Sequence, residues 1–380
     1  MLVLCGMTAN PAAAAPTASD HGRRPRFGEA IPWFTCRSLN GPAEYGINQA
    51  GGRPLLLLFF GTANHPLAQM ALGRAHKRRD WFDDTNASFF GVTVDPTDAQ
   101  VPRIGLELPG WRFLLDYDRK VSRLFGAAGE DGRYEPYWFL LDRHLRVVAD
   151  YPIREADAAL AHFRSLMDAP VAGDWAPVAL VENVIEPELC RHLISQYEDS
   201  APSESGVMRE IEGKTKLVLD NSFKVRRDHV VTDPALSQQL IARLQTRLRP
   251  MVRRCFSFEA THIERLLVGC YDEADGGHFR AHRDDTTRGT AHRRFAVTIN
   301  LNPDEYEGGD LVFPEFGQRR YRAPRGSAIV FSCSLLHQVT PVTKGRRFAL
   351  LPFLFDEAAA KLREANMHLI DTDPLRVGAA

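Results

Sequence analysis

The sequence predicts two domains, an α/β domain followed by a mainly-β domain with buttressing helices. The chain has 380 residues, which is more than one hydrophobic core usually serves. In the first half, apolar runs of strand length alternate with segments of helical periodicity. In the second half, short strand-like runs are separated by Gly, Asn and Pro turns. The halves are joined at 169–177, where small residues and prolines predict a linker.

The α/β domain is predicted over 27–168, after a disordered leader at 1–26 that is rich in Ala, Pro and Arg. The run at 55–60 is wholly apolar, as expected for a strand that is buried on both faces. Arg143 and His144 are predicted to form a two-residue turn that makes the last two strands a hairpin. The predicted strands are 55–60, 89–95, 111–116, 137–142 and 145–150, and the predicted helices begin near residues 66, 120 and 155.

Two helices are predicted to pack against the core of the mainly-β domain. The first begins at Pro187, and the second begins at Pro234 with Asp233 as its cap. The second keeps apolar residues at helical spacing as far as Val252, although Pro250 should kink or end it. Five arginines on or just after this helix are predicted to form its solvated face: Arg243, Arg247, Arg249, Arg253 and Arg254.

The strand-rich span from residue 293 to 353 predicts an antiparallel arrangement. Its runs are apolar and rich in β-branched residues, and they are separated by turn residues such as Asn302-Pro303 and Gly308-Gly309. The predicted strands are 178–181, 293–301, 310–313, 328–331 and 348–353, with Pro352 at an edge or at a strand end.

His282, Asp284 and His337 form a candidate metal-binding set. Residues i and i+2 of a strand point to the same side, so His282 and Asp284 can hold one metal from one strand. His337 lies 55 residues further on and can reach the metal from a strand folded back beside the first. Two histidines and one carboxylate are the ligands that leave half of the octahedron open on a non-haem Fe(II). The flanking His278 and His292 are not expected to bind the metal.

Residues 271–355, and more loosely 176–355, resemble the prolyl-4-hydroxylase-type branch of the 2-oxoglutarate/Fe(II) dioxygenases. The resemblance implies a double-stranded β-helix, or jelly roll, within a domain over 178–357 that is followed by a C-terminal tail at 358–380. The stretch 203–224 is polar and poorly periodic, so it is expected to form a loop or irregular hairpin over the barrel mouth, where substrate selection often resides. The matching segments are Gly277–Asp284, Leu301–Pro303, Glu307–Phe313 and His337–Arg347.

The same resemblance implies a 2-oxoglutarate pocket. A carboxylate that is left free when 2-oxoglutarate chelates iron requires a buried cation, and arginine binds a carboxylate through two parallel hydrogen bonds. Arg347 occupies the matching position, and Arg346, which should face the other side of the strand, is the first alternative. Tyr271 and Asn300 are further predicted contacts of the cosubstrate. For Thr298, the role of an ordinary strand residue stays an equal alternative.

Residues 27–168 resemble the peroxiredoxin branch of the thioredoxin-like fold in the order of their predicted strands and helices. Peroxiredoxins carry a nucleophilic cysteine after the first core strand, in a Pro-x-x-x-Thr-x-x-Cys loop. The corresponding loop here is Gly61–Pro66, and no cysteine occurs between Cys36 and Cys190. Because this chemistry requires a thiolate, peroxidase activity is not expected. Cys36 is predicted to be a half-buried structural thiol.

Composition narrows the remaining classes of function. The formal net charge is −1 and the pI is near 6.9, which favours neither nucleic acid nor an anionic membrane as a partner. No apolar run reaches the roughly 18 residues of a membrane span. Six scattered cysteines without a Cys-x-x-Cys motif predict neither a zinc site nor a disulfide framework. A cytoplasmic location is therefore expected.

The predicted function is that of a 2-oxoglutarate- and Fe(II)-dependent dioxygenase. It would use O2 to hydroxylate a C–H bond of a peptidyl, prolyl-like or small-molecule substrate and release succinate and CO2. Ascorbate is a further cofactor candidate. Two alternatives stay open, a redoxin-type thiol peroxidase with an accessory barrel and a non-catalytic sensor of 2-oxoglutarate or oxygen. The N-terminal domain is expected to dock substrate or to form a homodimer.

Overall fold

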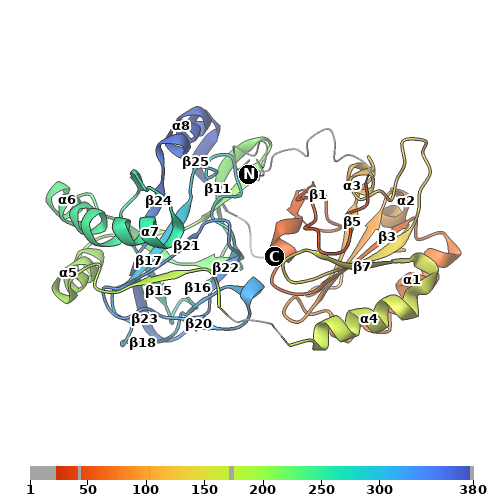
Figure 1. The fold of residues 1–380 in the computed structure, drawn as a ribbon, viewed down its shortest axis with the longest axis horizontal. Helices are drawn as coiled ribbons and strands as arrows, with labels where there is room; N and C mark the ends of the chain where they lie inside the picture. Colours follow the sequence, from red (N-terminus) through yellow and green to blue (C-terminus); the bar gives the residue numbers. More distant parts are fainter. Residues whose placement is uncertain (1–22, 42–43, 102, 171–174, 377–380) are drawn as a thin grey trace, which may run out of the picture. The chain divides into compact units, whose positions relative to one another are not determined.

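The structure is a computed structural model that describes residues 23–41, 44–101, 103–170 and 175–376 (Figure 1). The described chain divides into two compact units, 23–170 and 175–376. Most of the predicted leader and part of the predicted linker lie outside the described residues. In the part of the chain that the structure describes, no helix combines the length and the apolar character needed to cross a bilayer.

The N-terminal unit is built on a five-stranded mixed sheet in the order β5-β4-β3-β6-β7. Strands β3, β4 and β5 are parallel, whereas β6 runs antiparallel to both β3 and β7. This is the thioredoxin-like order that the sequence predicts. The strands are β3 (Leu55–Gly61), β4 (Ser88–Thr93), β5 (Trp111–Leu115), β6 (Tyr137–Leu141) and β7 (Val147–Pro152). A separate small pair is β1 (Thr35–Cys36) with β2 (Tyr45–Gly46).

Every residue of β3 is buried, because helices cover both faces of the sheet. Leu56 and Leu58 pack in one apolar cluster with residues of α1 (Pro66–His76) and α4 (Ala156–Asp168). Leu55, Leu57 and Phe59 alternate with them and pack in the opposite cluster, which includes Val121 of α3 (Lys120–Leu124). The short helix α2 (Thr97–Gln100) follows β4.

Two local predictions for this unit need correction. The β6–β7 connection runs from Asp142 to Arg146 and is therefore longer than the predicted two-residue turn. The Asp142 carboxylate accepts two backbone N–H groups in it, those of His144 and Arg146, and these bonds stabilise the longer loop. The last residues of the predicted leader also belong to the unit, because Arg24 pairs with Asp150 at 2.8 Å.

Two antiparallel sheets form the core of the C-terminal unit, as the predicted jelly roll requires, and a third sheet in this unit has three strands. The smaller sheet has the order β12-β16-β22-β19-β20: β12 (Lys224–Val225), β16 (His278–His282), β22 (His337–Val339), β19 (Leu311–Val312) and β20 (Arg320–Tyr321). The larger sheet contains β8 (Ala179–Val181), β9 (Ser203–Glu204), β13 (Arg227–Val230), β14 (His262–Glu264), β15 (Leu267–Asp272), β17 (Phe295–Asn300), β18 (Tyr306–Gly308), β21 (Ala328–Ser332), β23 (Val342–Leu350) and β24 (Phe353–Phe355).

Helices α5 (Pro187–Glu198), α6 (Pro234–Arg243) and α7 (Arg249–Phe256) contribute to one apolar cluster with the larger sheet. Asp233 caps α6 as predicted, because its side chain accepts the Ala235 N–H at 2.9 Å. The helix does not end at Pro250. A π-helical turn at Leu244–Leu248 precedes this residue and shifts the hydrogen-bond register, so that the proline falls in the first turn of α7.

The predicted C-terminal tail also forms regular structure. Helix α8 (Glu357–Asn366) is followed by β25 (Ile370–Arg376), which pairs in parallel with β11 (Lys214–Leu219). Strand β11 in turn forms an antiparallel hairpin with β10 (Val207–Ile211). The polar stretch 203–224, which was predicted as a loop or irregular hairpin, therefore contains a regular hairpin that supplies two strands of a three-stranded sheet.

Candidate metal centre

The structure brings the three predicted metal ligands together. Strands β16 and β22 pair so that His282 lies directly opposite His337, and Asp284 follows two residues after the end of β16. One donor atom from each of the three residues lies within 4.8 Å of the other two. His282 Nε2 is 3.5 Å from Asp284 Oδ1, and His337 Nε2 is 3.4 Å from Asp284 Oδ2. These distances leave room for a cation between the three side chains.

Backbone carbonyls orient both histidines. Nδ1 of His282 lies 2.8 Å from the Arg280 carbonyl, and Nδ1 of His337 lies 3.0 Å from the Leu335 carbonyl. A carbonyl can only accept, so each Nδ1 carries the proton and each Nε2 keeps its lone pair for a metal. Burial lowers the pKa of His337 to about 4, and the neighbouring His282 acts in the same direction. The neutral imidazole, which is the form that binds metal, is therefore favoured at neutral pH.

Aromatic side chains pack against the two histidine ligands. The Phe279 ring stacks on His282 with ring centres 3.4 Å apart, and the Phe331 ring meets His337 nearly edge-on at 4.7 Å. Phe279 and Phe331 are themselves buried. They restrict the access of water and hold the imidazole planes in place.

Arg347 is buried on β23 and is only 2% exposed. Its Nη2 donates to Thr298 Oγ1 at 3.2 Å, whereas Nε and Nη1 have no hydrogen-bond partner among the described residues. A buried guanidinium with unmet donors is costly unless a ligand accepts from it. The donors therefore fit a carboxylate, as the predicted 2-oxoglutarate pocket requires. Thr298 is more than an ordinary strand residue because it contacts this guanidinium.

The neighbouring Arg346 faces the other way. Its side chain is 46% exposed and pairs with Glu198 at 2.6 Å. Tyr271 is the direct cross-strand partner of Arg347, and its buried ring lies 5.1 Å from the guanidinium carbon. Asn300 is buried, donates to the Ala323 carbonyl at 2.8 Å, and leaves its Oδ1 without a partner among the described residues.

Tyr306 is a neighbour of Arg347 that the sequence did not indicate. Its hydroxyl is buried and has no partner within the described part of the chain. A Cβ placed on Gly309 would lie 3.1 Å from Arg347 Cδ and 3.4 Å from the Tyr306 ring, so the three residues are adjacent. Only the Gly-Gly turn that follows Tyr306 could have indicated this close approach.

A second missed group is the buried Arg226. Its guanidinium binds Asp228 at 2.6 and 2.7 Å and also donates to the Tyr271 hydroxyl at 3.4 Å. Ser205 joins this network, since it donates to Asp228 and accepts from the buried Lys224 at 2.7 Å. The Arg-x-Asp spacing was the available signal, because residues i and i+2 of an extended segment point to one side, and Arg226 directly precedes β13.

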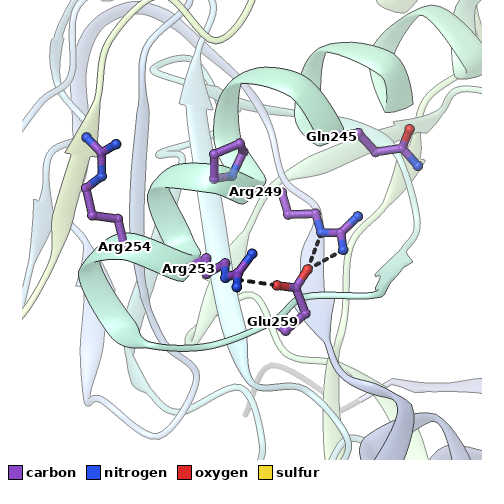
Figure 2. A pocket seen from close by; sticks show the side chains of 6 residues that line it. Gln245, Arg249, Arg253, Arg254 and Glu259 are labelled. Atoms are coloured by element: carbon purple, nitrogen blue, oxygen red, sulfur yellow. Dashed lines mark hydrogen bonds and ion pairs between the residues drawn. The ribbon is translucent and has the colours of Figure 1, made fainter.

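The arginine-rich surface of α7 lies apart from the ligand set. A depression of about 560 Å³ there is lined by Gln245, Arg249, Pro250, Arg253, Arg254 and Glu259, none of which is a predicted ligand (Figure 2). Arg249 and Arg253 both point toward Glu259, with Nε to carboxylate distances of 2.7 and 3.5 Å. Arg243 and Arg247 pair with Glu186. The predicted solvated face is therefore largely ion-paired, and such exposed pairs contribute little stability.

The redoxin-like loop of the N-terminal unit holds a hydrogen-bond network instead of a thiol. Thr62 Oγ1 donates to Asp95 at 2.7 Å, and the buried Asp98 accepts the Ala63 N–H at 2.9 Å. Cys36 is almost fully buried rather than half-buried. Burial, and secondarily Asp116, raises the pKa of its thiol to about 12, so the thiol stays protonated at neutral pH.

Comparisons with known proteins divide the chain in the same way. Residues 266–355 match the 2OG-Fe(II) oxygenase superfamily, and residues 27–150 match the AhpC/TSA family. A PKHD-type hydroxylase of Nitrosomonas europaea is 34% identical over 112 residues, which are 27% of this chain and 49% of that protein. One of Nitrosomonas eutropha is 32% identical over 131 residues, which are 32% of this chain and 58% of that protein. The chain thus spans about half the length of these curated relatives.

Among solved structures, a prolyl-4-hydroxylase of Pseudomonas putida is 17% identical, with a TM-score of 0.37, and the match covers 47% of this chain and 93% of that one. The two family matches agree with the resemblances stated from the sequence. The chain therefore joins a region similar to the AhpC/TSA family to a region similar to the 2OG-Fe(II) oxygenase superfamily.

Proposed function

We propose that the protein is a 2-oxoglutarate- and Fe(II)-dependent dioxygenase that hydroxylates a C–H bond. The observation that supports this most directly is the convergence of His282, Asp284 and His337 within 4.8 Å, in the same unit as a buried arginine with unmet donors. Neither feature has an evident structural purpose alone. Together they match the requirements of one metal and one dicarboxylate.

The side chains of the site have separable roles in this proposal. His282, Asp284 and His337 would hold Fe(II), which when bound supplies O2 activation coupled to decarboxylation of 2-oxoglutarate to succinate and CO2. Arg347 would bind the far carboxylate through the two nitrogens that the protein leaves unpartnered. Thr298 holds the guanidinium at its third nitrogen, and Phe279 excludes water beside His282.

The direct test is anaerobic titration of the apoprotein with Fe(II) and 2-oxoglutarate. A visible metal-to-ligand charge-transfer band is expected in the wild type and is expected to be absent from Asp284→Ala. Succinate release after admission of O2 then separates an enzyme from a non-catalytic sensor. A wild-type protein that binds Fe(II) and 2-oxoglutarate but never releases succinate would favour the sensor.

The substrate class is part of the proposal. The curated relatives are named as PKHD-type hydroxylases, which supports hydroxylation, and the proposed substrate is a peptidyl, prolyl-like group or a small molecule. Succinate release in the presence of peptide pools, with and without ascorbate, tests both the substrate and the ascorbate requirement.

The proposal also covers location and the N-terminal unit. A reducing cytoplasm would suit the ferrous iron. The N-terminal unit would dock substrate or form a homodimer. Sedimentation of the full chain tests the homodimer.

A further inference from the structure

Arg283, the residue between the two ligands of the His-Arg-Asp segment, is buried and ion-paired. Its side chain is 4% exposed, and that of its partner Glu315 is 8% exposed. Arg283 Nη2 donates to Glu315 Oε1 at 2.6 Å, and Nη1 donates to Oε2 at 3.1 Å. Two parallel charge-assisted bonds fix the orientation of both groups. The sequence pattern assigns a role to neither residue.

The pair reaches both halves of the ligand set. On one side, Arg283 lies directly between the ligands His282 and Asp284 in the chain. On the other side, Arg283 Nη1 donates to the carbonyl of Ser334, and Glu315 Oε2 accepts the backbone N–H of Leu336 at 3.2 Å. Leu336 immediately precedes the third ligand.

Other bonds join the same two segments. The Asp284 backbone N–H donates to the Cys333 carbonyl at 2.9 Å, and the Ser334 hydroxyl donates to the Asp285 carboxylate. Residues 283–285 and 333–336 are therefore connected through main chain and side chains together. Within this connection, the ion pair joins Arg283, which lies next to Asp284, to Ser334 and Leu336, which lead into His337.

We infer that the Arg283–Glu315 pair positions the metal ligands by fixing the turn that carries Asp284 against the segment that leads into His337. This inference rests on the proposed metal centre. A ligand set that is already held in the binding geometry has less to reorganise when the metal arrives. Loss of groups that orient metal ligands typically costs about 10–100-fold in metal affinity.

The test measures Co(II) binding to the full-length apoprotein by competition with a chromophoric chelator, together with the visible spectrum of the Co(II) complex. If the pair positions the ligands, both Glu315→Gln and Arg283→Met weaken Co(II) binding by about 10-fold or more and alter the spectrum. If the pair acts only through charge, the two changes shift affinity in opposite directions. Glu315→Gln leaves an uncompensated cation beside the metal, whereas Arg283→Met leaves an anion. Opposite shifts, or wild-type affinity in both variants, would overturn the inference.

Because breaking a buried pair also destabilises the fold, a double variant separates positioning from stability. Arg283→Met with Glu315→Leu keeps apolar bulk but cannot bond to the Ser334 carbonyl or the Leu336 N–H. We expect it to regain much of the melting temperature that the single variants lose without regaining Co(II) affinity. If the double variant recovers both the melting temperature and the Co(II) affinity, the pair has a purely structural role and the inference is refuted.

A matched control lies in the N-terminal unit, where Arg112 binds Asp84 at 2.7 and 2.6 Å. Asp84→Asn breaks a comparable two-bond pair and should lower stability while leaving Co(II) affinity unchanged. If the wild-type protein binds no Co(II), the metal centre itself is refuted. If the wild-type protein binds Co(II) and the variants bind it equally well, only the inference about the ion pair is refuted.

Discussion

Arg347 and Tyr271 face each other across strands β23 and β15, with the guanidinium carbon 5.1 Å from the centre of the tyrosine ring. The same guanidinium bonds to Thr298 and keeps two nitrogens without partners among the described residues. The tyrosine face and the threonine hydroxyl thus orient the cation while leaving donors for an anion. In the proposed function, that anion is the far carboxylate of 2-oxoglutarate.

Arg347→Ala is expected to raise the apparent KM for 2-oxoglutarate. The change would remove the buried charge partner of a carboxylate, at a cost of about 2–4 kcal/mol. Succinate release at varied 2-oxoglutarate and saturating Fe(II) measures it. Arg346→Ala is the matched control, because Arg346 pairs with Glu198 on the other side of the strand, and its KM should not change. The reverse result would move the anchor to Arg346.

His282→Ala, Asp284→Ala and His337→Ala should each abolish 2-oxoglutarate decarboxylation and leave a folded protein, because iron needs all three ligands. Circular dichroism checks the fold, and succinate release checks the activity. His278→Ala, on the same strand as His282, should retain activity because His278 Nδ1 bonds to the Gly276 carbonyl and lies outside the ligand set. Wild-type decarboxylation in any two of the three ligand variants would refute the assignment.

Gly309→Ala should raise the KM for 2-oxoglutarate as well as lower the melting temperature. An added Cβ would lie 3.1 Å from Arg347 Cδ and 3.0 Å from Val342 Cγ2, so the arginine must shift. The backbone strain at φ +62° adds roughly 1–2 kcal/mol. Gly276→Ala separates the two effects, since Gly276 has φ +71° and nothing within 4 Å of the added Cβ. It should lose stability with an unchanged KM.

The sequence predicted the ligand set because a strand period of two and a Gly-Gly turn are local signals. The spacing of two residues correctly indicated that His282 and Asp284 act together, but Asp284 lies in the turn after β16 and not on the predicted strand. Glu315 could not be connected to Arg283, because 32 residues separate them and no period relates them. Tyr306 was missed for a similar reason, since its neighbour Arg347 comes from another strand.

Strands were missed where the alternation of apolar and polar residues was weak, and the helix that contains Pro250 was expected to stop or kink because of that single residue. Strands β10 and β25 belong to a small sheet with few buried side chains, so neither shows a clear apolar alternation. Pro250 was predicted to kink or end the helix, and the helix instead continues past it after a π-helical turn at Leu244–Leu248.

Cys36 should resist iodoacetamide at pH 8 in the folded protein. Burial raises its pKa to about 12, so the reactive thiolate forms only as the pH approaches that value. Peptide mass spectrometry should show labelling of the exposed Cys255 first and of Cys36 only after denaturation. Thiol-dependent peroxide consumption by the full chain should stay at background and should not change in Cys36→Ser. Robust consumption that is lost in Cys36→Ser would restore the peroxidase alternative.

Separation of the two units should preserve the iron chemistry and remove the contribution of the N-terminal unit. The apolar clusters described for each unit are built from residues of that unit, and each unit has its own sheets. Fragment 27–168 should therefore fold, as measured by circular dichroism, and reduce no peroxide above background. Fragment 176–380 should bind Fe(II) and decarboxylate 2-oxoglutarate slowly.

The informative comparison for these fragments is the ratio of hydroxylated product to succinate. If the N-terminal unit presents substrate to the C-terminal unit, fragment 176–380 should release succinate with little hydroxylation of the substrate that the full chain accepts. If the N-terminal unit forms a homodimer, sedimentation should show dimers of the full chain and of 27–168 but monomers of 176–380. A fragment 176–380 with the coupling ratio and the association state of the full chain would contradict both roles and leave the redoxin-like unit without a part in the reaction.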